Sequence, residues 1–358
     1  MPYQKRQNSK TTDKQQTILF DCDETPLQAE ESSRTESIEE LNRQNLRSLH
    51  HANAASQAVQ SMRFISFGSG SSGNCSYVGT ETQGVLIDAG VDGDKVFKAL
   101  ADNGITPEMV KGVLLTHDHG DHVRYVYQIA RHNKHIHIYC TPRVLNGIFR
   151  RHSISRRLKE VHVSIFKEIP FTLAGMQFTA FEVSHDGTDN AGFFVEYGSQ
   201  RFAIATDLGC ITDRAKFYMT QADYLMIEAN YDAAMLDGGR YPEYLKNRIR
   251  ATNGHLDNKI TADFVANQCD DRLRYIFLCH LSNDNNTPEI ARHEVCAALE
   301  ARGRATTDGE GLPDANSNKV TVVALPRFDT SRRYVLRKST GNPAPTSHPQ
   351  NPQKTSHP

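Results

Sequence analysis

Short apolar runs that end at a polar residue recur through the middle of the chain. Residues 112–115, 201–206 and 274–279 are mainly apolar, and residues 177–184 alternate between apolar and polar positions. Alternation with a period of two, and apolar runs of this length, are typical of half-buried and buried strands. The pattern therefore predicts a rigid sheet whose strand ends carry polar side chains, where proteins commonly place functional groups.

The remaining pattern adds further strands and several helices. Residues 63–66 and 77–79 have the pattern of paired strands, whereas residues 121–132 have helical spacing. Thr141 followed by Pro142 predicts another helix start, because threonine caps a helix and proline suits its first turn. The length of the chain and the spread of its motifs fit a single four-layer α/β sandwich. Further expected elements are strands at 84–88 and 224–227 and helices at 241–249 and 259–269.

The two ends of the chain differ from this middle part. Residues 1–61 are dense in Gln, Asn, Ser and Thr, and residues 337–358 are rich in Pro and Asn. Such segments cannot bury enough apolar surface to offset the entropy of the chain. We therefore predict disordered extensions at both ends, with a short amphipathic helix at 37–49, and one folded domain at residues 62–336.

The composition restricts the class of protein. Among 358 residues there are seven cysteines, an odd number without a Cys-x-x-Cys pair, which fits reduced thiols. No apolar run is long enough to span a membrane, and the first residues lack the apolar core of a secretion signal. We therefore expect a cytoplasmic protein without a membrane partner. The formal net charge is −1, so attraction for nucleic acid must come from a local basic patch.

Potential metal ligands cluster directly after the apolar run 112–115 and follow the other runs. The sequence Thr-His-Asp-His-Gly-Asp-His begins at Thr116. Imidazole and carboxylate ligands suit zinc, manganese or iron(II), and two metals about 3.5–4 Å apart can generate a hydroxide nucleophile. The alternative is a polar turn rich in histidine by chance, but the H-x-H-x-D-H spacing favours a metal site. The seven candidate ligands are His117, His119, Asp121, His122, His185, Asp207 and His280.

This order of residues resembles the metallo-β-lactamase fold superfamily, in which a strand ending in Asp precedes H-x-H-x-D-H and then His, Asp and His. The resemblance implies a four-layer αββα sandwich that binds two divalent metal ions, zinc or manganese. It also implies a role for each ligand. One metal is held by His117, His119 and His185 and the other by Asp121, His122 and His280, with Asp207 as the bridge and Asp88 as an orienting residue.

Four flanking motifs narrow the resemblance within that superfamily. Residues 67–74, 228–232, 254–256 and 280–288 look like those of the YycJ/WalJ group of bacterial metallohydrolases, which are linked to 5′-to-3′ DNA exonuclease activity. One departure is Asp257, where that group would have serine after Gly-His-Leu. The residues of these motifs that we expect to contact substrate are Ser71, Ser72, Asn74, Asn230 and Asn286.

Two further features suit the binding of phosphate groups. The glycines of residues 67–74 either form a nest of backbone N–H groups for phosphate or serve only a tight hairpin. A basic run free of acidic residues follows at 143–159, and it is either solvated surface or a contact for a nucleic-acid backbone. The members of this basic run are Arg143, Arg150, Arg151, Arg156, Arg157 and Lys159.

We predict a two-metal phosphodiesterase that acts on DNA as a 5′-to-3′ exonuclease in repair or replication. The expected step is in-line attack on phosphorus by a metal-bridging hydroxide, which Asp121 holds or deprotonates. His255 is expected to protonate the leaving group or to contact phosphate, and the alternative for it is an interhelical core histidine. The competing functions are an RNA-processing hydrolase of the same fold and a small-molecule thioester or lactone hydrolase. A non-catalytic binding module is disfavoured because the ligand set is complete.

One short motif lies in the N-terminal extension. Residues 16–20, from Gln16 to Phe20, resemble the Gln-x-x-Leu-Phe peptide with which bacterial repair proteins dock on the replication sliding clamp. Leu19 and Phe20 would then enter a hydrophobic pocket and tether the enzyme to DNA. The alternative is an incidental apolar patch, since five-residue matches often arise by chance.

Overall fold

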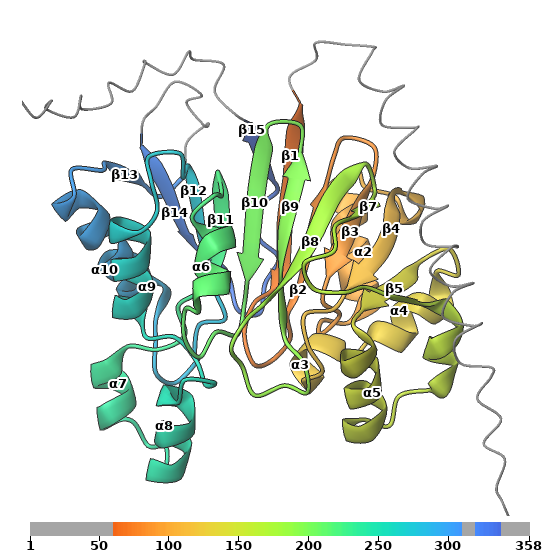
Figure 1. The fold of residues 1–358 in the computed structure, drawn as a ribbon, viewed down its shortest axis with the longest axis horizontal. Helices are drawn as coiled ribbons and strands as arrows, with labels where there is room; N and C mark the ends of the chain where they lie inside the picture. The colour runs from red at the N-terminus through yellow and green to blue at the C-terminus, as the bar shows by residue number, and fades with distance from the viewer. Residues whose placement is uncertain (1–59, 310–318, 338–358) are drawn as a thin grey trace, which may run out of the picture. The chain divides into compact units, whose positions relative to one another are not determined.

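The computed structural model describes residues 60–309 and 319–337, which form two β-sheets packed face to face between two layers of helices (Figure 1). These residues belong to one compact unit. The arrangement confirms the predicted four-layer αββα sandwich. Among the described helices, none combines the length and apolar character that a membrane span requires.

The first sheet contains the early strands of the described chain together with its last one. Its order is β15-β1-β2-β3-β4-β5-β6, antiparallel from β15 to β3 and parallel from β3 to β6. Ser61 of β1 pairs with Arg337 of β15, so a ladder joins both ends of the described domain. The strands are β1 Ser61–Gly68, β2 Cys75–Gly79, β3 Gly84–Ile87, β4 Val110–Leu114, β5 His137–Cys140, β6 His162–Ser164 and β15 Tyr334–Arg337.

The second sheet has the order β13-β14-β12-β11-β10-β9-β8-β7, parallel from β13 to β10 and antiparallel from β10 to β7. Four of its strands, β8, β10, β11 and β12, are the runs expected from the sequence. The strands are β7 Phe171–Leu173, β8 Met176–Glu182, β9 Ala191–Tyr197, β10 Gln200–Ala205, β11 Tyr224–Glu228, β12 Tyr275–Cys279, β13 Thr306–Thr307 and β14 Val320–Ala324.

Helices cover the outer face of each sheet, and a small helical pair extends beyond the second sheet (Figure 1). The expected helix start at Thr141 is present, since its side chain accepts a hydrogen bond from Val144 N–H. The first sheet carries α2 Gly93–Asp102, α3 Gly120–Val123, α4 Val126–His132 and α5 Pro142–Arg151, with short 3-10 turns η1 Pro107–Met109 and η2 Arg156–Val161; the second carries α6 Asp213–Met219, α9 Asn258–Asn267 and α10 Pro288–Ala301, and the pair is α7 Ala233–Gly238 and α8 Glu243–Arg250.

Aromatic side chains join the two sheets. Phe64 of the first sheet packs against Phe202 and Phe277 of the second, with ring centroids 5.3 and 4.6 Å away. Large buried aromatic rings contribute strongly to a core, both through area and through edge contacts. The sheets therefore form a rigid support, and the loops at one rim are fixed by the strands that precede them.

The helix expected over residues 121–132 is instead two helices, α3 and α4. The chain turns between them because Tyr125 N–H donates to Ala89 O in the loop after β3. This bond fastens the ligand-bearing turn to the neighbouring strand end. The helix expected at 37–49, the Gln16 to Phe20 segment and the two predicted extensions lie outside the described residues.

Candidate metal centre

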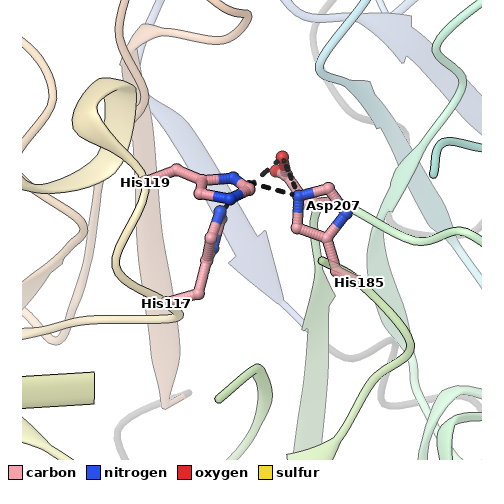
Figure 2. A group of neighbouring side chains, drawn as sticks. All are labelled: His117, His119, His185 and Asp207. Atoms are coloured by element: carbon pink, nitrogen blue, oxygen red, sulfur yellow. Dashed lines mark hydrogen bonds and ion pairs between the residues drawn. The ribbon is translucent and has the colours of Figure 1, made fainter. Parts of the chain in front are cut away.

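Strand ends from both sheets deliver the predicted ligands to one place. The His117–His122 loop follows β4 of the first sheet, while His185 follows β8 and Asp207 follows β10 of the second. Figure 2 shows His117 and His119 projecting from one side toward His185 and Asp207 on the other. The site is thus built across the two sheets.

The first metal group contains His117, His119, His185 and Asp207. Their ligand atoms all lie within 4.8 Å of one another. His119 Nδ1 lies 3.2 Å from His185 Nε2, and Asp207 Oδ2 lies 3.5 Å from His185 Nε2. Three imidazole nitrogens and one carboxylate converge on a single point, as expected for a cation between them.

The second metal group contains Asp121, His122 and His280, whose ligand atoms also lie within 4.8 Å of one another. Asp207 contacts this group too, with Oδ1 3.3 Å from His122 Nε2 and Oδ2 3.5 Å from His280 Nε2. Its carboxylate therefore lies between the two groups. This is the position that a bridging ligand requires.

The donor set fits divalent metals. His117 Nε2 is buried and has no hydrogen-bond partner among the described residues, a costly state for a polar atom. Its other ring nitrogen, Nδ1, lies 2.9 Å from the Thr116 hydroxyl. His185 Nδ1 donates to Gly254 O at 2.9 Å, which leaves Nε2 as the lone-pair nitrogen. Ring nitrogens oriented in this way are typical of metal-binding histidines.

Asp88 supports the ligand loop without belonging to either metal group. Its Oδ2 accepts from His122 Nδ1 at 2.8 Å, and its Oδ1 accepts from Thr116 N–H at 2.9 Å. The carboxylate thus fixes both the tautomer and the orientation of His122. We interpret Asp88 as an orienting residue, which is the role that the resemblance implied.

Burial keeps the imidazoles of the first group neutral. It lowers the pKa of His117 well below its usual value and lowers that of His119 to about 4. Burial lowers the pKa of His185 as well. Neutral imidazole is the form that binds a metal, so these three side chains need lose no proton on binding.

Carboxylates reverse this effect in the second group. Burial by itself would lower the pKa of His280, but Asp207 and further acidic neighbours raise it to about 10. The pKa of His122 is likewise raised, with Asp207 and Asp88 outweighing burial. Burial would raise the pKa of Asp207, yet His280 and His122 hold it well below its usual value. A cation that binds here must displace protons.

Three strand-end residues adopt left-handed backbone conformations. The φ angles are 62° at Asp88, 52° at Asp207 and 53° at His280. Such a conformation costs of order 1–3 kcal/mol in a non-glycine residue and persists only where surrounding structure enforces it. Here the sharp turn aims each side chain into the centre as soon as its strand ends.

Glu228, which the sequence analysis did not single out as a site residue, connects several parts of the centre. It is fully buried at the end of β11, and its Oε1 accepts from His280 Nδ1 at 2.9 Å and from His255 Nδ1 at 2.8 Å. Its Oε2 accepts from the N–H groups of Leu208 and Leu256. The sequence feature that could have predicted Glu228 is a carboxylate at the end of an apolar strand, as at Asp88.

Asp186 is a second site residue that the sequence pattern did not predict. Its Oδ1 lies 3.2 Å from His119 Nε2, and Arg248 Nη2 donates to its Oδ2 at 2.7 Å. The Asp186 side chain is 24% exposed, in contrast to Asp88 and Glu228. It directly follows His185 in sequence, so no strand pattern marked it.

His255 lies beside the centre, as expected, but outside the seven ligands. Its ring stacks on that of His280 with centroids 5.2 Å apart, and its side chain is 18% exposed. Because a carboxylate only accepts, the bond to Glu228 places the proton on Nδ1. Nε2 is then the ring nitrogen available to a substrate. Asp257, the departure from the group pattern, caps α9 through Lys259 N–H, which a serine would also do.

Three of the expected substrate contacts are buried within the protein. Asn286 donates to Ala229 O and exchanges bonds with Asn258, and Asn230 donates to His280 O. Asn74 donates to Asp121 Oδ2 at 3.2 Å. Because their amides already bond interior groups, the structure favours a supporting role for them over the contact with substrate that we predicted.

Ser71 and Ser72 are exposed at the tip of the glycine- and serine-rich loop. Much of this loop bonds internally: Gly70 N–H donates to Asn74 Oδ1 and Gly73 N–H to Gly70 O. A Cβ on Gly73 would lie 2.5 Å from Gly90 O. Close packing therefore explains this glycine, and only the tip remains open to a substrate.

The basic run lies next to the first metal group. Gly147 of α5 packs on Asp118, and Arg151 Nε lies 3.3 Å from Asp118 Oδ2. Asp118 itself is buried between two ligands, His117 and His119. The exposed members of the run are thereby held at a fixed place beside the centre.

Comparison with known proteins agrees with this geometry. Residues 83–280 match the model of the family described as beta-lactamase superfamily domain. The chain is 30% identical over 254 residues to the exodeoxyribonuclease YycJ of Bacillus anthracis, an alignment that covers 71% of this chain and 95% of that protein. It is 31% identical over 223 residues to the exodeoxyribonuclease WalJ of Streptococcus pneumoniae, covering 62% and 82%.

Solved structures share the fold at low sequence identity. The metallo-beta-lactamase fold protein YhfI of Bacillus subtilis is 13% identical, with a TM-score of 0.55 over 77% of this chain and 99% of that one. Zn²⁺-bound PqqB of Methylobacterium extorquens is 18% identical, with a TM-score of 0.53 over 75% and 99%. These likenesses concern the architecture alone.

Proposed function

Because the chain belongs to the beta-lactamase superfamily and is a metal-dependent hydrolase related to YycJ and WalJ, we propose that it is a DNA exonuclease. The observation that carries the proposal is the double metal group with Asp207 between its halves. Two adjacent cations can stabilise both the attacking and the leaving oxygen of a phosphodiester. The two exodeoxyribonuclease relatives support DNA as the substrate.

We infer that the centre binds two divalent ions, zinc or manganese. His117, His119 and His185 would hold one, Asp121, His122 and His280 the other, and Asp207 both. The ions would supply a water of lowered pKa and positive charge for the transition state. Imidazole-rich sites accept several first-row metals, and the affinity order favours zinc.

The side chains of the protein supply the remaining functions. Glu228 fixes the Nδ1 proton of His255, so Nε2 can carry a proton toward the oxygen of the leaving nucleotide. Asp121, whose side chain is 18% exposed, is the most exposed ligand of the second metal group and would hold the proton of an incoming water. Ser71 and Ser72 would contact the strand at the loop tip.

The proposed polarity is 5′ to 3′, and the proposed role is in DNA repair or replication. The motif resemblance to the YycJ/WalJ group supports both. RNA processing and small-molecule hydrolysis remain the alternatives, and they differ from the proposal in substrate rather than in the metal centre.

One experiment separates these readings. Protein reconstituted with zinc or manganese is given single-stranded DNA, duplex DNA or RNA, labelled at the 5′ or the 3′ end. We expect release of the label as mononucleotide from 5′-labelled DNA, while 3′-labelled DNA shortens progressively. Cleavage of RNA in preference to DNA would establish the RNA-processing alternative. Cleavage of neither nucleic acid would leave small-molecule hydrolysis.

The N-terminal peptide is a separate proposal about partners. A peptide of residues 13–24 should bind the sliding clamp, because Leu19 and Phe20 supply the apolar anchors of the motif. The matched control carries Leu19→Ala and Phe20→Ala and should not bind. Equal binding by both peptides, or none, would remove the clamp without affecting the nuclease proposal. We also place the enzyme in the cytoplasm, where such a partner would be found.

A further inference from the structure

A small cavity lies next to the second metal group. Its volume is about 160 Å³, and it is bounded by the glycine- and serine-rich loop, the start of α2 and the segment after β14. Ligand pockets for drug-sized molecules are usually about 300–1,000 Å³, so this one suits a small group. The polar and aromatic residues of its wall include Ser72, Lys95, Arg124, Tyr125, Arg327 and Phe328.

Its wall is continuous with the metal centre. Gly90 lines the cavity, and a Cβ on this residue would lie 1.5 Å from the backbone oxygen of Asp121. Asn74 N–H donates to the same oxygen at 2.8 Å. Arg327 donates to Leu281 O, directly after the ligand His280. A group held in the cavity is therefore separated from the second metal group by a single layer of chain.

The charge of the cavity favours an anion. Lys95, Arg124 and Arg327 contribute three cations, while the acidic residue of the wall is Asp92. The Asp92 carboxylate is occupied as the cap of α2, where its Oδ1 accepts from the N–H groups of Asp94 and Lys95. The balance within the wall is thus positive, which attracts phosphate.

Donors also remain for a bound group. Arg327 Nη2 donates to the Ser71 hydroxyl at 3.3 Å, but its buried Nε has no partner among the described residues. Arg124 is exposed, and Nη1 is held 3.3 Å from Ser72 O. Guanidinium groups fixed in this way match the oxygens of a phosphate.

An exposed aromatic ring lies at the same place. Phe328 is 56% exposed, and the Arg327 guanidinium lies 5.3 Å from its ring centroid. A large exposed aromatic side chain beside cations is the arrangement on which single-stranded nucleic acids stack their bases.

We propose that this cavity binds a phosphate group of the DNA strand and that Phe328 stacks on the adjoining base. The inference rests on the proposed nuclease function. The basic run contacts the strand beside the first metal group, and the cavity holds it beside the second. The basic run and the cavity together position the DNA strand over the metal centre.

The test compares two double variants. Lys95→Gln with Arg124→Gln removes two exposed cations of the cavity, and both changes leave the core intact. The matched control, Lys98→Gln with Arg131→Gln, removes two exposed cations from α2 and α4 that do not line the cavity. Binding to labelled single-stranded DNA is measured by fluorescence anisotropy in the presence of chelator, over a range of salt concentrations.

We expect the cavity variant to bind DNA about tenfold more weakly for each contact removed. The slope of log affinity against log salt should fall in magnitude by about 0.7, because the cavity holds one phosphate and each neutralised phosphate of a single strand contributes about 0.7. The control should retain the slope of the wild type. Phe328→Ala should weaken binding without changing the slope, since stacking releases no counterion.

DNA strands with different ends show whether the cavity binds a terminal or an internal phosphate. If the loss is confined to 5′-phosphorylated DNA, the cavity holds the terminal phosphate. If 5′-hydroxyl and 3′-phosphorylated strands lose affinity equally, it holds an internal one. Equal binding by the cavity variant, the control and the wild type would overturn the inference.

A second substrate keeps the two proposals distinguishable. With metals added, the cavity variant should hydrolyse bis(p-nitrophenyl) phosphate as fast as the wild type, because this small diester needs no strand-binding surface. Failure of the wild type to cleave any DNA would refute the nuclease proposal alone. Cleavage of DNA by the wild type and the cavity variant at equal rates would refute the cavity alone.

Discussion

The two halves of the metal centre use the same kinds of ligand but hold them differently. In the first half, His185 bonds outward to a backbone carbonyl and His117 to a hydroxyl. In the second half, His122 and His280 each bond a buried carboxylate. The first three imidazoles are therefore neutral, whereas the second pair is held protonated until a cation replaces the protons.

This difference bears on how each half would work. A carboxylate behind an imidazole raises its basicity and strengthens its bond to a metal. Exposure does not distinguish the halves, since each has one partly exposed ligand, His119 at 19% in the first and Asp121 at 18% in the second. We therefore expect the second half to depend strongly on its supporting residues and the first half to be more tolerant.

The largest effect should come from the residue that both halves share. Asp207→Ala should lower hydrolysis by at least about a thousandfold, because the charge between two cations is worth several kcal/mol. The fold should persist, since the residue lies on a loop. Activity, bound metal by elemental analysis and circular dichroism together test this. Full activity of the wild type in excess chelator would refute the metal assignment itself.

His255→Ala tests whether His255, which stacks on the ligand His280, acts in turnover or supports the metal ligands of the second half. Turnover should fall by about a hundredfold, as expected for loss of a general acid, while the metal content is unchanged. His255→Asn is the matched control, since it keeps a donor for Glu228 without a titratable ring. Loss of metal in parallel with activity would make His255 part of the ligand scaffold.

The supporting carboxylates provide the direct comparison. Asp88→Asn and Glu228→Gln should each weaken binding to the second half by about 10–100-fold and leave the first half nearly unchanged. A metal titration should therefore separate into two steps in these variants. Equal weakening of both steps would show that the halves are not independent.

The basic run lies on the side of the first half. Gln in place of Arg150, Arg156 and Arg157 should weaken binding of DNA by about tenfold at low salt and flatten its salt dependence. Arg151 is kept because it bonds Asp118 beside two ligands. Hydrolysis of a small diester should be unchanged. DNA binding equal to that of the wild type at every salt concentration would remove the run from the substrate path.

Asp186→Asn should have the smallest effect. Asp186 is the carboxylate behind His119, but it is partly exposed and already paired with Arg248. Exposed charge pairs contribute little, about 0–1 kcal/mol, so metal affinity should fall by less than about fivefold. A loss as large as that of Asp88→Asn would contradict the contrast between the halves.

The sequence by itself determined many of the strands and the layer architecture, and it placed the candidate ligands at strand ends. These depend on short-range patterns: an apolar run specifies a strand, and the next polar residue stands at its end, as at Asp88 and His280. The interrupted helix after His122 escaped prediction because Tyr125 bonds Ala89, a residue 36 positions earlier that no local pattern connects to it.

Only the tertiary structure decided which polar residues support the ligands and which are free. Glu228 and His280 are 52 positions apart, yet they share a buried hydrogen bond. Asn286 looked like a contact for substrate, but its amide donates to two other chain segments inside the protein, residues 229–230 and Asn258. The cavity beside Arg327 likewise combines distant segments. A residue type specifies which bonds a side chain can form, whereas burial and long-range packing decide which of them it forms.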